Sequence, residues 1–469
     1  MDYSAANPGL WNPILQLGII AIAILVANLL RRKIPAIRST LLPAAVLGGF
    51  LLLIVKLLGI VSIDKAFMEM LVYHCIAIGF IAMTLRVPEE RDKAKGQLTG
   101  LKSGAVIVSS YMIQGVLGLL ITLILAHTFM PGLFEAAGIL LPMGYGQGPG
   151  QANNIGFTYE GLGFAGGRSF GLAIAATGYI VACVVGVIYV NMLVRQGKVQ
   201  RIDSEDLARS ATVEDFQHKD EAPVSESIDR FTIQVCLVAI VYLVTFLATW
   251  GLTSFLTAVA PGVGATVNTL LWGFNFIVGS AIALLARIAL KKMKNGRIMT
   301  RQYQNNYLLS RISGMAFDIM IVAGIASIEL EDLSGLWVPF LLLVVLGAVV
   351  TLFHLKFVCK RVYGDYYYEG LVSMYGMMTG TISSGILLLR EIDPQFSTPA
   401  ANNLVIGSSF GILLGIPILI LVGLAPKSTL LCVITIAICA AYYAILLWVI
   451  FLKPRASKKQ RAGSTAIEE

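Results

Sequence analysis

The sequence predicts an all-α integral membrane protein built from two inverted repeats, each with five transmembrane helices and one re-entrant hairpin, followed by one extra C-terminal helix. Three observations lead to this prediction: the hydropathy of the chain, the distribution of its basic residues, and a motif that occurs in both halves. Of the 469 residues, 57% are hydrophobic and 13% are charged, and the mean hydropathy is +0.79. A water-soluble protein of ordinary core size cannot bury so large an apolar fraction.

Eleven apolar stretches are long enough to cross a bilayer, which takes about 20 helical residues at 1.5 Å each. They cover 14–30, 39–60, 68–85, 104–127, 167–194, 231–257, 265–289, 311–329, 335–356, 402–424 and 428–452. Short basic runs follow the first, third, fifth, seventh and last of these stretches. The positive-inside rule places all of these runs in the cytoplasm.

This topology leaves only Lys56, Lys65, Arg168 and Lys427, out of 35 Lys and Arg residues, on the outer side. It predicts an outer N-terminus and a cytoplasmic C-terminus in a bacterial inner membrane. It also requires the segments near 136–160 and 370–391 to enter and leave by the same face, because a full crossing at either would invert every later loop. Both segments are therefore predicted to be re-entrant hairpins.

The same pattern divides the chain into a first repeat (1–195), a second, inverted repeat (230–427), an extra helix (428–452) and a basic cytoplasmic tail (453–469). Residues 196–229 form a polar cytoplasmic linker, for which a regulatory helix is the alternative. The basic tail is expected to contact anionic membrane lipid. Since the basic residues form short loop runs and no basic face, the net charge of +8 does not indicate a nucleic-acid partner.

The repeat rests on two matches in the same order. Tyr145-Gly146 and Tyr375-Gly376 each begin the pattern Tyr-Gly-x-x-x-Gly, and the sequence Ser-Phe-Gly recurs at Ser169 and Ser409. A chance similarity between glycine-rich helices is the alternative explanation of these matches. Inverted repeats with broken helices near the membrane midplane are typical of secondary transporters, because exchanging the conformations of the two halves changes the side from which the site is open.

The hairpin tips combine glycines, which let the backbone turn, with small polar side chains. Irregular backbone at membrane depth persists only where protein or a water-filled cavity satisfies its polar groups. Helix N-termini at such tips favour a carboxylate, whereas hydroxyl and amide oxygens can also simply join helices. The predicted substrate-binding residues are Gln147, Gln151, Asn153, Asn154, Thr379, Thr381, Ser383 and Ser384.

Asp318 lies in the apolar run from Ile312 to Ile328, where an ionised carboxylate costs roughly 2.5–3.5 kcal/mol on insertion scales. A Na⁺ ion or a proton would offset this cost, and a structural hydrogen-bond partner is the alternative. The predicted Na⁺ site consists of Asp318, Gly146, Gly376 and Thr379. No cofactor is expected beyond Na⁺ as the coupling ion.

Other polar residues have simpler structural interpretations. We expect Arg168 and Arg390 to extend to the membrane interface, although either could attract an anion. Asn402 and Asn403 could cap a helix start or face the cavity, and we expect them to cap the helix. The six cysteines lack the spacing of a zinc site or a disulfide framework, and we expect free thiols.

Two stretches carry a resemblance to a known family. The hairpin from Gly144 to Gly156, the run from Arg311 to Asp318 and the overall plan resemble the sodium/glutamate symporters (ESS family). This resemblance implies a five-plus-five inverted architecture, an elevator-like movement of a domain containing both hairpins, a homodimer held by scaffold helices, and Na⁺-driven glutamate uptake.

Both hairpins depart from the usual family pattern. The first has Gln147, Pro149, Gln151, Asn153 and Asn154 in place of small alanines and a histidine or threonine, and 377–381 replaces a turn containing alanine and proline. The resemblance therefore implies the fold and the ion coupling more directly than the substrate, which could be another amino acid or a dicarboxylate.

Two other classes of function compete with a carrier. An ion channel would need a pore motif or a continuous ring of like groups, and the sequence instead offers paired hairpins. A membrane enzyme would need convergent carboxylates, histidines or a nucleophile with its base. The sequence therefore predicts a transporter and no enzyme activity, most specifically Na⁺-coupled symport of glutamate or a related small carboxylate.

Overall fold

The computed structural model describes residues 2–38, 42–87, 93–199, 230–259, 275–296, 302–393 and 398–452, together with 268, 271, 272, 298 and 299. All regular elements in these ranges are helical. Most of the predicted linker 196–229, namely 200–229, and the whole predicted tail 453–469 lie outside the described residues.

The first half of the chain forms five long or medium helices. They are α1 (Pro8–Lys33), α3 (Ala44–Leu57), α4 (Lys65–Leu85), α5 (Lys93–His127) and α8 (Gly167–Arg195), and the short α2 (Pro35–Arg38) follows α1. Polar caps mark two starts: the Asn7 side chain accepts from the backbone N–H of Leu10 at α1, and Asp64 accepts from that of Phe67 at α4. Such caps satisfy N–H groups that lack a partner within the helix.

The second half forms α9 (Arg230–Val259), α11 (Asn275–Asn295), α12 (Asn306–Ala326), α13 (Trp337–Val362), α16 (Ala400–Leu414), α17 (Ile416–Leu424) and α18 (Thr429–Phe451). The prediction that Asn402 and Asn403 cap a helix is wrong. Pro399 occupies the cap position of α16 and provides no side-chain hydrogen bond, whereas Asn403 Nδ2 donates to the Tyr366 hydroxyl at 2.9 Å.

Within the described residues, eight helices are long and apolar enough to cross a bilayer, and α16 with α17 makes a ninth if this pair, bent by 50°, is one span. The segment predicted to cross at 39–60 contains α3, which has only 14 residues and starts directly after Pro43. A helix of that length rises about 21 Å and falls short of the hydrocarbon core. α11 covers part of the predicted crossing 265–289. The count of eleven crossings stays a prediction.

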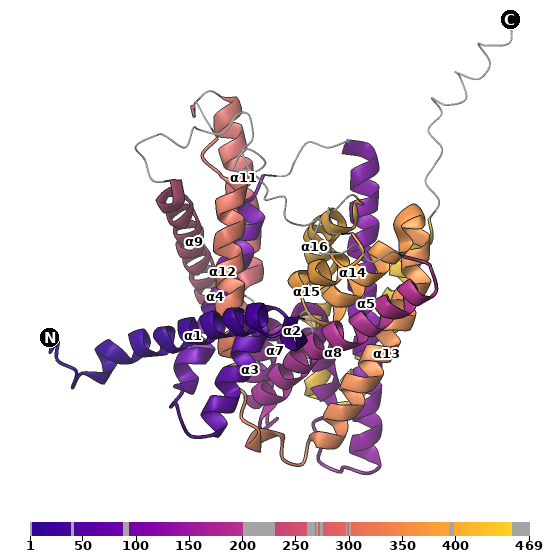
Figure 1. Cartoon of the computed structure of the whole chain (residues 1–469), viewed down its shortest axis with the longest axis horizontal. Helices are drawn as coiled ribbons and strands as arrows, with labels where there is room; N and C mark the ends of the chain where they lie inside the picture. The colour runs from indigo at the N-terminus through magenta and orange to yellow at the C-terminus, as the bar shows by residue number, and fades with distance from the viewer. Residues whose placement is uncertain are drawn as a thin grey trace, which may run out of the picture.

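The helices pack into two groups, and each group takes helices from both halves of the chain. One group, the α4–α12 bundle, contains α1, α3, α4, α9, α11 and α12, with its closest packing between α4 and α12. The other, the α5–α16 bundle, contains α5, α8, α13, α16, α18 and the segments described below, with α5 packed on α13, α16 and α18. Figure 1 shows α9, α11 and α12 on one side and α5, α13 and α16 on the other.

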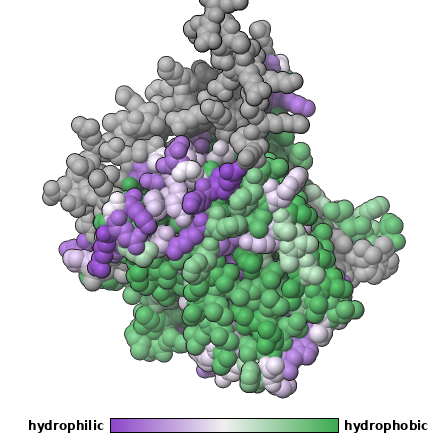
Figure 2. Space-filling view, turned by 90° about the vertical axis from the view of Figure 1, so that its right-hand side faces the viewer, coloured by the Kyte–Doolittle hydropathy of each residue, from purple (hydrophilic) through white to green (hydrophobic). Residues whose placement is uncertain are grey.

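The surface of the molecule has a broad apolar area. Figure 2 shows it as a continuous green region, with hydrophilic residues gathered above it and a few along its lower edge. Long apolar side chains of α13 contribute exposed surface, among them Leu341, Val345 and Phe353. Exposed apolar area of this extent is typical of a surface that faces lipid. The chain therefore has the properties of a multi-pass α-helical membrane protein.

Candidate functional site

Two segments have the order helix, break, helix. In the first, a helical turn (Leu140–Pro142) and a π-helical turn (Met143–Gln147) stop at Gly148, and α7 (Pro149–Glu160) follows. In the second, α14 (Tyr367–Thr379) stops at Gly380, and α15 (Ile382–Leu389) follows Thr381. These segments coincide with the predicted hairpins at 136–160 and 370–391.

The second segment folds back on itself at its break. A Cβ on Gly376 of α14 would lie 2.8 Å from Gly385 Cα of α15, so these two helices pack side by side. In the first segment, Gly138 packs on Gly118 of α5, while α7 runs along α8 with a Cβ on Gly156 only 2.5 Å from Gly167 O. The breaks therefore form two tips within the α5–α16 bundle.

The two tips lie against each other. A Cβ placed on Gly148 would be 3.6 Å from Thr381 Cγ2. Beside them, Gly178 of α8 leaves room for both segments, since a Cβ there would overlap the Thr379 carbonyl oxygen and come within 2.9 Å of the Tyr145 ring. The close approach of the tips thus depends on the absence of a side chain on α8.

Both helices that start at the tips lack a side-chain cap. Gly148 precedes α7 and Thr381 precedes α15, and neither provides a capping hydrogen bond. By contrast, α1, α4, α12 and α18 each have one. The first backbone N–H groups of a helix have no partner within it, and the helix dipole makes this end positive. Two such ends at one point form a site suited to an anion such as a carboxylate.

A cavity of about 160 Å³ opens between the tips and the α4–α12 bundle. Its volume is close to that of cavities known to hold a benzene-sized molecule, roughly 150 Å³. Both tips contribute polar groups to it, and the facing wall is apolar. The polar lining residues are Tyr111, Gln147, Gln151, Thr381 and Ser408, and the apolar wall includes Ile76, Phe80, Phe276, Phe317, Met320 and Ile321. No Asp, Glu, Lys or Arg among the described residues lines it.

The cavity brings together four of the predicted site residues. Gln147, Gln151 and Thr381 line it, as does Gly146, which was assigned to the predicted Na⁺ site. Gln151 is 2% exposed, and its Oε1 makes no hydrogen bond within the described part of the chain.

Other predicted residues lie near the tips without lining the cavity. Asn153 and Asn154 are buried on α7, with Asn153 Nδ2 donating to Asn154 Oδ1 at 3.4 Å. Thr379 Oγ1 donates to Tyr375 O at 2.8 Å, within its own helix. Ser384 is buried behind the second tip. The side chain of Ser383 lies outside the described residues.

The two remaining residues of the predicted Na⁺ site have different surroundings. Gly376 packs against Gly385 and Leu388, in the contact between α14 and α15. Asp318 is exposed on α12, in the other bundle, and is not among the residues that line the cavity. Its carboxylate is close enough to the Tyr179 hydroxyl to interact with it electrostatically. Among the described residues, no group of three or more His, Cys, Asp or Glu side chains could hold a metal ion.

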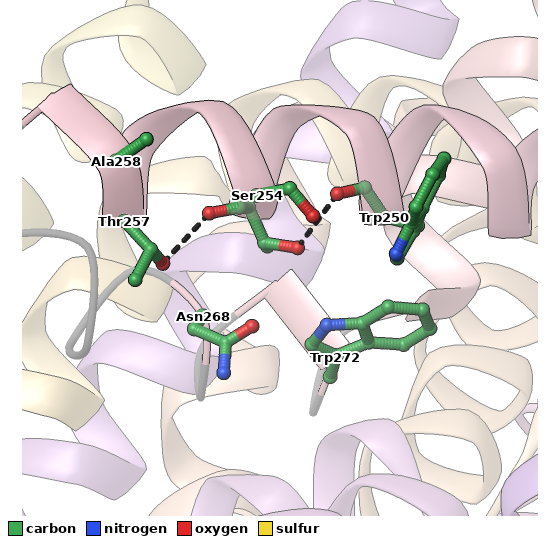
Figure 3. A pocket seen from close by; sticks show the side chains of 7 residues that line it. Trp250, Ser254, Thr257, Ala258, Asn268 and Trp272 are labelled. Carbon is green, nitrogen blue, oxygen red and sulfur yellow. Dashed lines mark hydrogen bonds between the residues drawn. The ribbon is translucent and has the colours of Figure 1, made fainter.

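A second, larger hollow of about 460 Å³ lies between α9 and the residues Asn268 and Trp272 (Figure 3). Trp250 and Trp272 border it, and its threonine hydroxyls already have partners: Thr253 Oγ1 donates to Thr249 O and Thr257 Oγ1 to Thr253 O, both at 2.8 Å. Tryptophans of this kind are common at the membrane interface. The smaller cavity at the tips is the better candidate site, because polar groups converge on it.

Three buried polar residues were missed by sequence reasoning. Gln114 of α5 contacts the second tip through Met378, and Tyr179 of α8 lies beside Thr381 of the same tip. His354 of α13 is hydrogen-bonded to Ser109 and Tyr443, which joins α18 to α5 and α13. A signal existed for Gln114, the only amide side chain in the apolar run 104–127, and for His354, a histidine within 335–356.

Arg168 has specific partners at the start of α8. Its guanidinium forms ion pairs with Glu69 of α4 and with Glu160 at the end of α7, where Nε and Oε2 are 3.4 Å apart, and it stacks over the Phe157 ring. It therefore links the two bundles. The predicted extension to the membrane interface does not describe this arrangement.

One comparison with known proteins identifies the family. A family model described as sodium/glutamate symporter matches residues 12–386, which include both tips and most of the helices. No curated protein matches the chain. The family consists of transporters and not of enzymes, which confirms that part of the sequence-based prediction. The chain therefore belongs to the sodium/glutamate symporter family.

Proposed function

We propose that the chain is a secondary active transporter that couples Na⁺ to the uptake of glutamate or a related small carboxylate or amino acid. The observation that carries the proposal is the meeting of two uncapped helix N-termini, at Gly148 and Thr381, beside a small cavity. The family membership supports transport and Na⁺ as the coupling ion.

The chemistry of the cavity favours an anionic substrate held without a basic side chain. Backbone N–H groups at the two helix starts bind a carboxylate, and the helix dipoles offset part of its charge. Gln147 and Gln151 can bond a second polar group of the substrate, since an amide both donates and accepts. Another organic anion or dicarboxylate in the same fold is the alternative substrate.

We propose an elevator-like mechanism, in which the α5–α16 bundle moves relative to the α4–α12 bundle. The position of the cavity supports this, because the tips supply its polar side and Phe80, Phe276 and Phe317 of the other bundle supply an apolar wall. An apolar wall makes no directional bonds to the substrate, so the bound substrate can move along this wall together with the tips. Both tips would be re-entrant, entering from opposite faces of the membrane.

An inverted repeat would account for the two bundles. Each bundle combines helices from positions that the sequence predicts to be equivalent in the two halves, such as α4 with α12 and α5 with α13, and these pairs are packed together. We further propose a homodimer held by the α4–α12 bundle in a bacterial inner membrane, with lipid around it, an outer N-terminus and a cytoplasmic C-terminus.

Uptake of radiolabelled L-glutamate into proteoliposomes, with and without an inward Na⁺ gradient, tests the proposal. Gradient-dependent, saturable uptake is expected, and aspartate, citrate and malate as competitors rank the substrates. Transport of a competitor and not of glutamate would change the substrate only. A flux that does not saturate would favour an ion channel, and the absence of any Na⁺-dependent flux would contradict the symporter.

A further inference from the structure

We propose that Gln114 of α5 supplies an oxygen ligand to the coupling Na⁺, at a position between the two tips and behind the substrate cavity. This inference rests on the proposed function, because it locates an ion that the transporter must bind. Gln114 is fully buried (0% exposed) and belongs to neither hairpin segment. The sequence motifs at the tips therefore do not identify the role of Gln114.

The hydrogen bonds of Gln114 determine how its amide is oriented. Nε2 donates to Thr351 Oγ1 of α13 at 2.8 Å and to Met378 O of α14 at 3.0 Å. The Met378 carbonyl can only accept, so rotating the amide by 180° would place two acceptor oxygens against each other. Both Nε2 hydrogens are therefore used in hydrogen bonds, and this orientation of the amide also determines the direction in which Oε1 points.

Oε1 of Gln114 points toward the first tip. A Cβ on Gly146 would lie 3.3 Å from this oxygen, which makes no hydrogen bond within the described residues although it is buried. A buried amide oxygen without a partner is unfavourable, because it has lost its bonds to water. A bound cation would provide the missing interaction.

Several other buried oxygens of the two tip segments share this property. Buried side-chain oxygens of Gln151 and Asn153 on α7, and of Tyr375 and Ser384 on the second segment, also make no hydrogen bond in the described structure. Neutral oxygens and backbone carbonyls near broken helices are the ligands that transporters use for Na⁺. The last turn of α14, whose Met378 carbonyl is fixed by Gln114, adds the negative end of a helix dipole.

The position of Gln114 favours a small ion over the ammonium group of an amino-acid substrate. Gly146 and Tyr111 line the cavity, but Gln114 does not, and it lies beyond Gly146. Because Gln114 contacts α14 and lies beside Gly146, an ion bound there would also hold the two tips together. Na⁺ binding would thereby organise the carboxylate site, which couples the two ligands.

The experiment compares Gln114→Leu, Gln114→Met and a matched control in the purified protein. Gln16→Leu is the control, since Gln16 of α1 is also a buried glutamine (5% exposed) whose Oε1 makes no hydrogen bond within the described residues, but it lies in the other bundle. Two quantities are measured: the rise in Tm when NaCl replaces KCl without substrate, and the Na⁺ concentration for half-maximal uptake in proteoliposomes.

In Gln114→Leu we expect the Na⁺-specific rise in Tm to be lost and the half-maximal Na⁺ concentration to increase about tenfold or more, a change typical of altered metal sites. Gln114→Met, which has a similar length but no oxygen, should also lose the Na⁺ response, whereas Gln16→Leu should keep it. A normal Na⁺ response in Gln114→Leu or in Gln114→Met would overturn the ligand role. If the unmodified protein itself shows no Na⁺-dependent uptake, the proposed function fails instead.

Discussion

Gly148 and Thr381 meet tip to tip, with Thr381 Cγ2 3.6 Å from the place where a Cβ on Gly148 would lie. They come from opposite halves of the chain, yet each immediately precedes a helix without a side-chain cap. Their contact makes one anion site out of two helix starts.

Gly148 has φ +92° and ψ −176°, a conformation that is essentially restricted to glycine. We expect Gly148→Ala to lower Tm and to raise the KM for substrate, since the strain is of order 1–3 kcal/mol and displaces the start of α7. Gly18→Ala in α1 is the control, because its Cβ would have nothing within 4 Å. Equal behaviour of the two variants would remove Gly148 from the site.

Thr381 tests whether the second tip contacts the substrate. We expect Thr381→Val, which keeps the shape and removes the hydroxyl, to raise the KM for substrate about tenfold, equivalent to a lost hydrogen bond of about 1.4 kcal/mol. Thr435→Val is the control, because Thr435 is buried in α18 and donates to Leu431 O. Uptake kinetics in proteoliposomes measure the KM of both variants, and an unchanged KM in Thr381→Val would contradict a substrate contact.

Asp318 is the only acidic residue in the run from Ile312 to Ile328. We expect Asp318→Asn to weaken the Na⁺ dependence of substrate binding, because the variant loses a charge that faces Tyr179 beside the tips. Substrate binding is measured over a series of Na⁺ concentrations at constant ionic strength. Unchanged Na⁺ dependence would exclude Asp318 from the coupling site.

Arg168 connects α8 to α4 and α7 through Glu69 and Glu160. We expect Arg168→Gln to destabilise the protein by about 2–3 kcal/mol, because two partly buried carboxylates then lose their counter-charge; a fully buried pair would cost more. Thermal unfolding in detergent measures the effect. Arg195→Gln, at the exposed opposite end of α8, should leave Tm within error, and a similar fall there would argue against a specific role of the ion pairs.

His354 anchors the C-terminal helix α18. Its Nδ1 is 3.0 Å from the Tyr443 hydroxyl, and its Nε2 is 3.1 Å from Ser109 Oγ. We expect Tyr443→Phe to cost about 1–2 kcal/mol by itself and to add little in the His354→Ala background, because the bond that it removes is already lost there. A double-mutant cycle on Tm measures the coupling, and additive effects would show that the two residues act independently.

Sequence patterns located the tips, although they did not define the whole site. Glycine and small polar residues in apolar surroundings identified Gly146, Gln147, Gln151 and Thr381, and all four line the cavity. The same reasoning included Gly376, which lets α14 and α15 pack closely, because a glycine that lets helices pack and one that lets a chain turn look alike in sequence. It omitted Gln114, since nothing in a lone amide within a helix indicates which distant segment it contacts.

The sequence by itself determined that the chain is a helical membrane protein and where its helices are interrupted, because hydropathy, loop charge and glycine spacing act over short distances along the chain. Only the tertiary structure decided that Gly148 meets Thr381, that Gln114 bonds the carbonyl of Met378, and that the apolar wall of the cavity comes from α4, α11 and α12. These contacts join residues far apart in the chain, and the packing of whole helices against one another sets them.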